Sequence, residues 1–243
     1  MIEEEEHLLH QADLIFTHSE GLRQLYQPLA RRPIILVPSA ADVAHFQSSF
    51  EIDPQAAQIP MPRMGIVGTL DNRIDTEMLY ALAYQHPDWH FVFIGHIRSE
   101  RVDLGPLLDL KNVHHLGERP FLELPGFLNA MTLNLVPYVL NEMTRYISPL
   151  KVYEYLAVGK PVVSVDLPEV RRLSDCVTVV PTAFGEANLR AQAFANGIQH
   201  AMNSNTPKME RKRRKAAWRH TWDERVNIMW QAVEFVLKEE SDE

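Results

Sequence analysis

Short apolar runs alternate with longer segments of helical periodicity along most of the chain. This alternation is typical of stacked βα units, whose strands lie side by side in a parallel sheet covered by helices. The pattern therefore predicts an α/β fold with a doubly wound parallel sheet. The predicted strands are Asp13–Thr17, Pro33–Val37, Met64–Val67, Phe91–Ile94, Val113–Leu116, Leu133–Val136, Val162–Val165 and Val177–Val180.

Helix-start residues and polar breaks divide these strands into units. Helices are expected at Glu3–His10, after Ser19 as N-cap, over Asp75–Gln85 and Leu122–Asn129, from Ser148 onward, and in long segments ending near Lys238. Prolines and glutamines without apolar periodicity predict a linker over residues 48–62. Residues 1–47 then form a short βα segment, residues 63–220 the main domain, and residues 221–243 a C-terminal helix.

Three predicted strands are each followed closely by a glycine, namely Gly68, Gly95 and Gly117. Each could be an ordinary turn residue, or could let a ligand approach the backbone in a conformation of positive φ. Open α/β sheets bind ligands at the carboxyl ends of their strands, so three such glycines favour a binding crevice there. The G-x-G-x-x-G dinucleotide fingerprint and the G-x-x-x-x-G-K-[ST] phosphate loop are both absent from the sequence.

Charge and composition exclude several classes of protein. The chain has 24 basic and 32 acidic residues and a net charge of −8, which argues against a nucleic-acid-binding protein. No apolar run approaches the length of a membrane span, and the acidic start differs from a signal peptide. The single cysteine, Cys176, fits a reducing compartment. We therefore expect a soluble, cytoplasmic protein.

The segment after Ser148 combines features of an anion-binding helix terminus. Ser148 is the expected N-cap and Pro149 the first helical residue, while Lys151 lies in the first turn, where the helix dipole disfavours a cation. Glu154 follows three residues later on the same face. A diphosphate on the helix terminus and ribose hydroxyls on Glu154 would explain the pattern. A weak surface ion pair between Lys151 and Glu154 would explain it equally well.

The segment Ser148–Ala157, followed by Gly159–Val163, is the most distinctive motif of the chain. Weaker motifs precede it at Ala12–Ile15 with His18 and Ser19, at Val37 and Pro38 with Asp42 and Phe46, and at Gly65–Leu70, Phe93–Gly95 and Val113–Gly117. Together these motifs resemble the retaining GT-B glycosyltransferases called glycosyl transferases group 1. The resemblance covers nearly the whole chain. It implies a Rossmann-like donor-binding C-terminal domain, preceded by the tail of the N-terminal domain.

The resemblance implies a nucleotide-sugar site without a metal or another cofactor. Backbone amides near Ser148, Pro149, Leu150 and Lys151 would hold the diphosphate, and Glu154 the ribose. Lys151 and Glu154 are thus the expected catalytic residues, the former by stabilising the departing diphosphate. The backbone near Gly68, Thr69 and Gly95 would approach the donor. The remaining loop, which would pack on the nucleobase, consists of Gly117, Glu118, Arg119 and Pro120.

Two positions depart from the family pattern. Members usually carry an arginine directly after the first glycine, where this chain has Thr69, so Arg73 is the nearest candidate cation for the phosphates. Many members also carry paired glutamates eight positions apart, and the earlier position is Tyr146 here. Glu142 could act on the sugar from a neighbouring turn, or could be a solvated loop carboxylate.

The expected function is the donor-binding half of a glycosyltransferase that moves a sugar from a nucleoside diphosphate sugar to an unknown acceptor in glycan or polysaccharide biosynthesis. The acceptor-side domain is represented only by its tail, so a complementary chain or self-association would complete the cleft. A non-catalytic nucleotide-sugar-binding subunit of a split enzyme is the alternative. An epimerase on the same fold is weaker, because it also needs both domains.

Three further features of the sequence bear on partners and metal binding. Six basic residues between Lys208 and Lys215 could contact an anionic membrane peripherally or could be a solvated helix face. Helically spaced apolar residues from Trp218 to Val236 predict packing, with part of this stripe lacking its cover. The histidine pairs have no carboxylate or thiolate at ligand spacing, so no metal site is expected.

Overall fold

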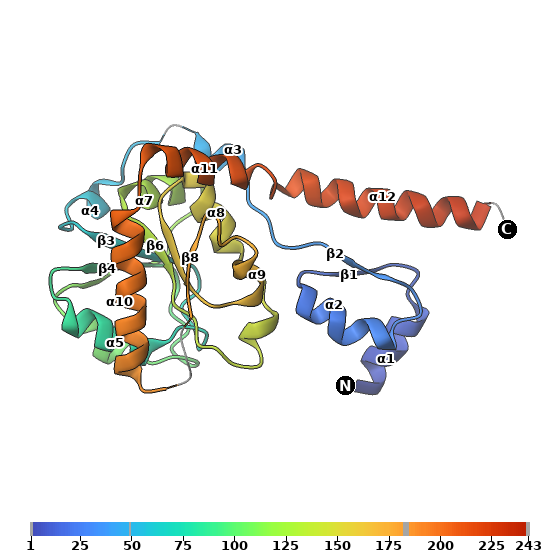
Figure 1. Ribbon diagram of the computed structural model, residues 1–243, viewed down its shortest axis with the longest axis horizontal. Coiled ribbons are helices and arrows are strands. Elements are labelled where there is room, and N and C mark those ends of the chain that lie inside the picture. The colour runs from blue at the N-terminus through green and yellow to red at the C-terminus, as the bar shows by residue number, and fades with distance from the viewer. Residues whose placement is uncertain (1, 49, 182–184, 242–243) are drawn as a thin grey trace.

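The computed structural model describes residues 2–48, 50–181 and 185–241. Within them, the larger part of the molecule is built on one six-stranded parallel sheet in the order β5-β4-β3-β6-β7-β8 (Figure 1). The sequence pattern predicted this class of sheet because strands buried on both faces read as continuous apolar runs. The strands are β3 (Arg63–Val67), β4 (His90–Ile94), β5 (Val113–His115), β6 (Leu133–Val136), β7 (Val162–Val165) and β8 (Thr178–Val180).

Successive strands are added to the sheet first in one direction and then in the other, and this change of direction lies at the centre of the sheet. From β3 the chain winds outward through β4 to β5, then crosses back to β6 and winds the other way to β8. A doubly wound sheet opens a crevice where the carboxyl ends of the two halves diverge, here between β3 and β6. The predicted α/β doubly wound fold is therefore confirmed.

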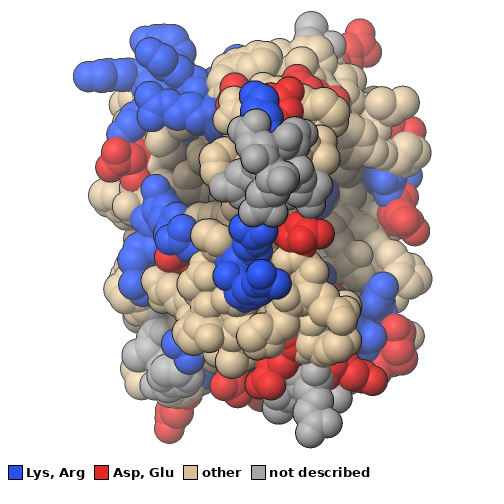
Figure 2. Space-filling model, turned by 90° about the vertical axis from the view of Figure 1, so that its right-hand side faces the viewer, with Lys and Arg blue, Asp and Glu red and all other residues tan. Residues whose placement is uncertain are grey.

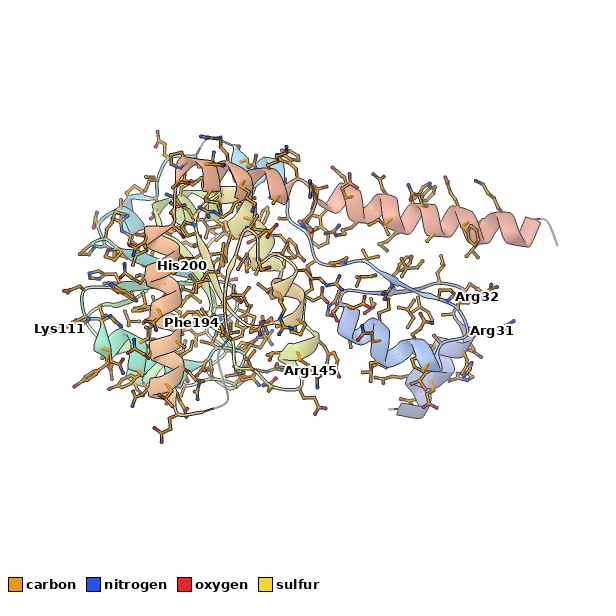
Figure 3. The ribbon with its side chains drawn as sticks, viewed as in Figure 1. Arg31, Arg32, Lys111, Arg145, Phe194 and His200 are labelled. Carbon is orange, nitrogen blue, oxygen red and sulfur yellow. The ribbon has the colours of Figure 1, made fainter. Side chains whose placement is uncertain are left out.

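Helices cover both faces of this sheet. α5 (Thr76–Gln85) and α10 (Ala187–Asn203) pack together on one face, and Phe194 of α10 is buried against the core (Figure 3). α7 (Leu124–Ala130) and α8 (Leu150–Val158) pack against each other, with α3 (Val43–Gln47) and α11 (Pro207–Ala217) against α8. Short helices α4 (Pro54–Ala57), α6 (Gly105–Leu108) and α9 (Pro168–Arg171) lie in the connections.

A smaller segment lies beside the main sheet (Figure 1). It contains α1 (Ile2–Gln11), β1 (Ile15–Thr17), α2 (Glu20–Tyr26), a short 3₁₀ helix (Gln27–Leu29) and β2 (Ile34–Leu36). β1 and β2 pair in parallel as a separate two-stranded sheet. The long helix α12 (Trp222–Ser241) leaves the main domain and runs across this segment. Among the described residues, no helix is both long enough and apolar enough to span a bilayer.

Most predicted elements are confirmed, with ends displaced by one or two residues. β6 and β7 have the predicted bounds, and Ser19 accepts the Leu22 amide as the predicted N-cap of α2. The predicted linker is less irregular than expected, because Asp53 caps α4 and Ala56 and Ile59 are buried. Ser49 lies outside the described residues. The pattern also missed α3, α6 and α9, which are too short to show helical periodicity.

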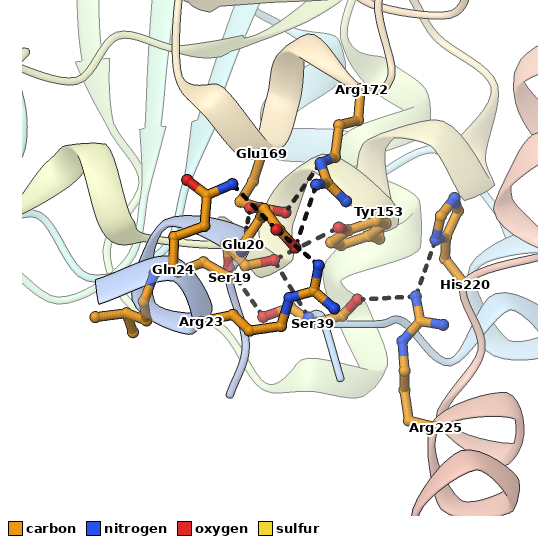
Figure 4. A network of polar contacts seen from close by, with 12 residues as sticks. Ser19, Glu20, Arg23, Gln24, Ser39, Tyr153, Glu169, Arg172, His220 and Arg225 are labelled. Carbon is orange, nitrogen blue, oxygen red and sulfur yellow. Dashed lines mark hydrogen bonds and ion pairs between the residues drawn. The ribbon is translucent and has the colours of Figure 1, made fainter. Parts of the chain in front are cut away.

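Polar contacts join the smaller segment to the main domain (Figure 4). The backbone amide of Glu20, at the start of α2, donates to the Glu169 carboxylate of α9 at 2.7 Å. Arg225 of α12 donates to the carbonyl oxygen of Pro38 at 2.8 Å, and one of its amino groups lies 2.9 Å from His220 Nδ1. These contacts fix α2 and α12 against the main domain through buried or half-buried groups.

His220 makes the stability of this junction depend on pH. Burial, together with the charges of Arg225 and Arg219, lowers the pKa of His220 from 6.5 to about 4. The folded state therefore favours neutral His220, and its contribution is complete above pH 6.5 and declines as the pH falls toward 4. This residue should lower the free energy of unfolding by about 2 kcal/mol between pH 7 and pH 4.5.

The matched measurement is urea unfolding across this pH range for the natural chain and for His220→Gln, whose amide oxygen can still accept from Arg225. His90 and His114, whose pKa values are also lowered by burial, titrate in both proteins and cancel in the difference. The variant should show a shallower fall of stability. An identical slope in the two proteins contradicts the assignment.

Candidate functional site

The three glycines predicted at the strand ends lie together at the carboxyl edge of the sheet. Gly68, Gly95 and Gly117 have φ values of 132°, 145° and 75°, so all three adopt the positive φ that the sequence left as one possibility. The Gly68 amide donates to the Ile94 carbonyl oxygen, and the Gly95 amide donates to that of Gly117, both at 2.9 Å. A Cβ atom added to Gly95 would lie 1.9 Å from the carbonyl oxygen of Gly68. The backbones of adjacent strand ends therefore approach each other more closely than any side chain would permit.

A buried tyrosine holds α8 against this edge. The hydroxyl of Tyr155 accepts the Val67 amide at 2.9 Å, and Tyr155 is almost fully buried. Burial raises the pKa of Tyr155, so the hydroxyl stays protonated. Because Val67 directly precedes Gly68, this bond fixes the first turns of α8 relative to the end of β3.

The start of α8 differs from the prediction by one residue. Pro149 is the N-cap, α8 begins at Leu150, and no side chain caps this end among the described residues. The prediction that Ser148 caps the helix is wrong, because its hydroxyl accepts the Ser39 amide at 3.2 Å instead. The Ser39 hydroxyl in turn donates to the Ser148 carbonyl oxygen at 2.9 Å. Ser148 thus joins the start of α8 to the connection between β2 and α3, and no side chain caps the first amides of α8 among the described residues.

Lys151 and Glu154 form a close ion pair at this end of α8. The Lys151 ammonium lies 2.8 Å from Glu154 Oε2, with 23% of the Lys151 side chain exposed and 3% of the Glu154 side chain. A Cβ atom added to Gly68 would lie 3.6 Å from Lys151 Cε, so the lysine stem passes directly over the glycine. The sequence allowed either a diphosphate site or a surface ion pair at these two residues. The structure contains the ion pair, and it is more buried than a surface pair.

Burial raises the pKa of Glu154, and the charges of Lys151 and His45 partly offset this rise. His45 lies on α3, where its ring stacks on Phe121 at 4.7 Å between ring centroids, and its Nε2 lies 3.2 Å from the Phe121 carbonyl oxygen. Glu154 Oε1 accepts no hydrogen bond from the described residues. The site therefore combines one half-satisfied buried carboxylate with one adjacent ammonium.

The sequence pattern gave no indication that His45 lies near this ion pair. The family motif includes only Phe46 of α3 and its N-cap, Asp42. The helix α3 itself has only five residues, so its periodicity gave no signal. His45 lies close enough for its charge to act on Glu154 because α3 packs on α8.

Arg73, the expected phosphate cation, already has a carboxylate partner. Its guanidinium binds Asp71 in a bidentate manner, at 2.8 Å and 2.9 Å, and lies 5.7 Å from the ring centroid of Tyr138. Thr69 is exposed. Asp71 neutralises most of the charge that Arg73 would bring, and the spacing of Asp71 and Arg73 in the sequence could have indicated this pairing.

The loop expected at the nucleobase turns its arginine away from the strand ends. Glu118 and Pro120 are exposed, and no atom lies within 4 Å of a Cβ atom added to Gly117. The Arg119 guanidinium instead donates to Gln55 of α4 and lies 5.2 Å from the ring centroid of Phe127. The Arg119 side chain is therefore engaged elsewhere and is not free to contact a base.

Among the described residues, neither Glu142 nor Tyr146 forms a hydrogen bond or an ion pair with Lys151 or Glu154. Glu142 is exposed in the loop before α8. Tyr146 packs on α2, where a Cβ atom added to Gly21 would lie 2.8 Å from its ring. The loop between them is ordered by Thr144, which exchanges hydrogen bonds with Asn141 at 2.9 and 3.0 Å. Among the described residues, no group of three histidines, cysteines or carboxylates could hold a metal ion.

Comparison with known protein families shows to which family the chain belongs. The family model described as Glycosyl transferases group 1 matches residues 62–204, which is more than half of the chain and includes the glycines and α8. The chain belongs to the glycosyl transferases group 1 family. Among curated relatives, TuaH of Bacillus subtilis (strain 168), described as a putative teichuronic acid biosynthesis glycosyltransferase, is 32% identical over 111 residues. That match covers 45% of this chain and 28% of TuaH.

Solved structures confirm the GT-B fold of this family member. HepE of Anabaena, crystallised in complex with UDP-glucose, superposes with a TM-score of 0.72 at 17% identity, covering 98% of this chain and 67% of HepE. Sucrose-phosphate synthase of Thermosynechococcus elongatus superposes with a TM-score of 0.71 at 19% identity, covering 98% and 61%. The chain therefore spans about two thirds of these structures and a smaller part of TuaH.

Proposed function

We propose that the amino end of α8 binds the diphosphate of a nucleoside diphosphate sugar, and that the chain is the donor-binding half of a glycosyltransferase in glycan or polysaccharide biosynthesis. The observation that carries this proposal is the Lys151–Glu154 pair of 2.8 Å, which lies over Gly68 at the uncapped start of a helix. A helix amino terminus with free amides and an adjacent ammonium matches a diphosphate.

Donor binding in this proposal exchanges one partner of Lys151 for another. The diphosphate takes the ammonium and the amides of Leu150 and Lys151, and the two oxygens of Glu154 accept the ribose hydroxyls. The positive end of the helix dipole and Lys151 then stabilise the negative charge that develops on the diphosphate as the sugar leaves. Arg73 would contact the diphosphate only if its guanidinium group left the Asp71 carboxylate. Gly95 and the backbone of residues 117–120 form the wall against the base.

The relatives support the donor class. HepE was crystallised with UDP-glucose, and TuaH is described as a putative glycosyltransferase of teichuronic acid biosynthesis. The complex of HepE favours a uridine nucleotide here. A cytoplasmic location, where we expect such donors to be available, stays a prediction.

The apolar surface of the smaller segment supports a completing partner. A cavity of about 530 Å³ opens between the two-stranded sheet and α12, and α12 exposes further large apolar side chains. Roughly a third of HepE has no counterpart in this chain. We propose that a complementary polypeptide covers this surface and supplies the acceptor wall of the cleft. The cavity is lined mainly by Leu9, Ile15, Phe16, Leu22, Ile34, Val37 and Met229.

The second candidate function, a non-catalytic nucleotide-sugar-binding subunit, rests on the same uncovered surface. A donor site with one wall leaves its bound sugar open to water. Both candidate functions use the same donor site, but only the glycosyltransferase would transfer the sugar.

Calorimetric titration of the chain with UDP and GDP tests the site, and release or transfer of sugar from a labelled nucleotide sugar tests turnover. Glu154→Gln should weaken the binding of the favoured nucleotide by about 1.5–3 kcal/mol, the value of hydrogen bonds to a charged group. Binding without turnover favours the subunit. Unchanged affinity of the Glu154→Gln variant overturns the ribose role of this carboxylate.

A further inference from the structure

A positively charged cavity lies away from the strand ends, between α9 and the end of α11. Its volume is about 330 Å³. Figure 2 shows Lys and Arg side chains gathered at the upper left of the molecule, on the side where α11 lies. The lining of the cavity contains four cations and one carboxylate together with smaller apolar groups, namely Arg172, Lys212, Lys215, Arg219, Asp175, Leu173, Cys176 and Ala216.

The positive charges of this cavity are poorly balanced. Within the described residues, Lys215 and Arg219 have no carboxylate within 4.0 Å, and both are exposed. Lys212 donates to the backbone carbonyl oxygen of Asp175 at 2.8 Å, while the Asp175 carboxylate is 4.0 Å away and 91% exposed. In the part of the chain that the structure describes, two cations therefore lack a carboxylate partner, and a third is held mainly by a neutral group.

The fourth cation, Arg172, is only loosely paired. It lies 3.6 Å from the Glu20 carboxylate and 3.9 Å from that of Glu169, longer than a charge-assisted hydrogen bond. His220 also lines the cavity and is neutral at pH 7, with a pKa lowered to about 4. A net positive charge thus surrounds the cavity in a chain whose own net charge is −8.

The rest of the basic run on α11 serves the structure. Arg213 is buried and donates to the Gly159 carbonyl oxygen at 2.7 Å, and Arg214 donates to that of Val158 at 3.1 Å. These two arginines satisfy carbonyl groups at the carboxyl end of α8, where the helix dipole favours cations. The interpretation of the whole run as a solvated helix face is wrong for Arg213. Lys212 and Lys215, one turn apart, are the members that turn toward the cavity.

We propose that this cavity is a phosphate-binding site, distinct from the nucleotide site at α8, that holds a phosphomonoester or phosphodiester group. Guanidinium groups bind phosphate oxygens in pairs and ammonium groups add point charge, and the concave shape strengthens their combined field. A soluble phosphorylated compound and an anionic lipid headgroup carry the same group. The site does not depend on the proposed transferase function.

The only cysteine of the chain provides a local readout, because Cys176 lines the cavity. The alkylation rate of Cys176 by iodoacetamide is measured with and without inorganic pyrophosphate, at constant ionic strength and with UDP present to fill the α8 site. Pyrophosphate should slow alkylation about threefold or more, because it covers the thiol and its charge disfavours the thiolate.

A pair of matched variants locates the effect. Lys215→Gln with Arg219→Gln removes two cations of the cavity, at and just beyond the end of α11. Lys208→Gln with Arg211→Gln removes two exposed cations of α11 that do not line the cavity. Protection of Cys176 should disappear in the first variant and persist in the second. Equal protection in all three proteins, or equal loss in both variants, overturns the site.

Vesicles of phosphatidylglycerol, with phosphatidylcholine as control, distinguish the source of the phosphate. Flotation with the anionic vesicles that is lost only in the Lys215 and Arg219 variant assigns the site to a lipid headgroup. Pyrophosphate protection without flotation assigns it to a soluble compound. Absence of both overturns the proposal.

Discussion

Replacing Lys151 with glutamine should weaken the binding of UDP about tenfold to a hundredfold while changing the binding of uridine little, because a hydrogen bond to a charged group contributes about 1.5–3 kcal/mol. The ammonium lies at the first turn of α8 over Gly68, where it can reach a phosphate on the helix amides. A glutamine there can still donate a hydrogen bond but carries no charge. Isothermal titration calorimetry with UDP and uridine measures both affinities.

Two control variants separate this loss from other effects. Lys160→Gln removes the same charge just beyond the opposite end of α8, and should leave UDP binding nearly unchanged. Lys151→Gln alone also leaves Glu154 buried without its cation, which costs stability. Combining it with Glu154→Gln makes the pair neutral and should restore much of that stability without restoring affinity. Equal losses for uridine and UDP would contradict a phosphate role for Lys151.

Alanine at position 95 should destabilise the folded chain by about 3 kcal/mol or more, since a positive φ and a backbone clash act together. The new Cβ atom would lie 1.9 Å from the Gly68 carbonyl oxygen, and the φ of 145° suits glycine only. Relief of the clash requires the ends of β3 and β4 to separate. UDP binding should therefore fall together with stability, as measured by urea unfolding and by titration.

Gly117→Ala is the matched control for this clash. Its φ of 75° disfavours alanine, but nothing lies within 4 Å of the added Cβ atom. We expect a cost of about 1–2 kcal/mol, which is that of the left-handed conformation alone. If the two alanine variants lose the same stability, close approach of the strand ends is not what requires glycine at position 95.

The fold could be predicted from the sequence because burial imposes a simple pattern. β6 and β7 are buried along their whole length, and their apolar runs end where the strands end. β1 and β8 are shorter than predicted, since the predicted runs begin before the first paired residue. Helices of four or five residues, such as α3 and α9, have too few turns to show a period.

The sequence could predict only two features of the candidate site, namely the glycines at the strand ends and the helix that carries Lys151 and Glu154. The glycines and the i,i+3 spacing of Lys151 and Glu154 follow from local sequence, and the structure brings them together. The partners of Ser148, Arg119 and Tyr146 are distant in the sequence, namely Ser39, Gln55 and Gly21. Such tertiary contacts leave no periodic signal in one sequence.

The central claim is that the amino end of α8 holds a nucleoside diphosphate, and a crystal structure of the chain with UDP tests it most directly. We predict phosphate oxygens within hydrogen-bond distance of the Leu150 and Lys151 amides, the Lys151 ammonium moved from Glu154 to the diphosphate, and the ribose hydroxyls on Glu154. UDP bound elsewhere, with the 2.8 Å ion pair of Lys151 and Glu154 unchanged, would contradict the claim.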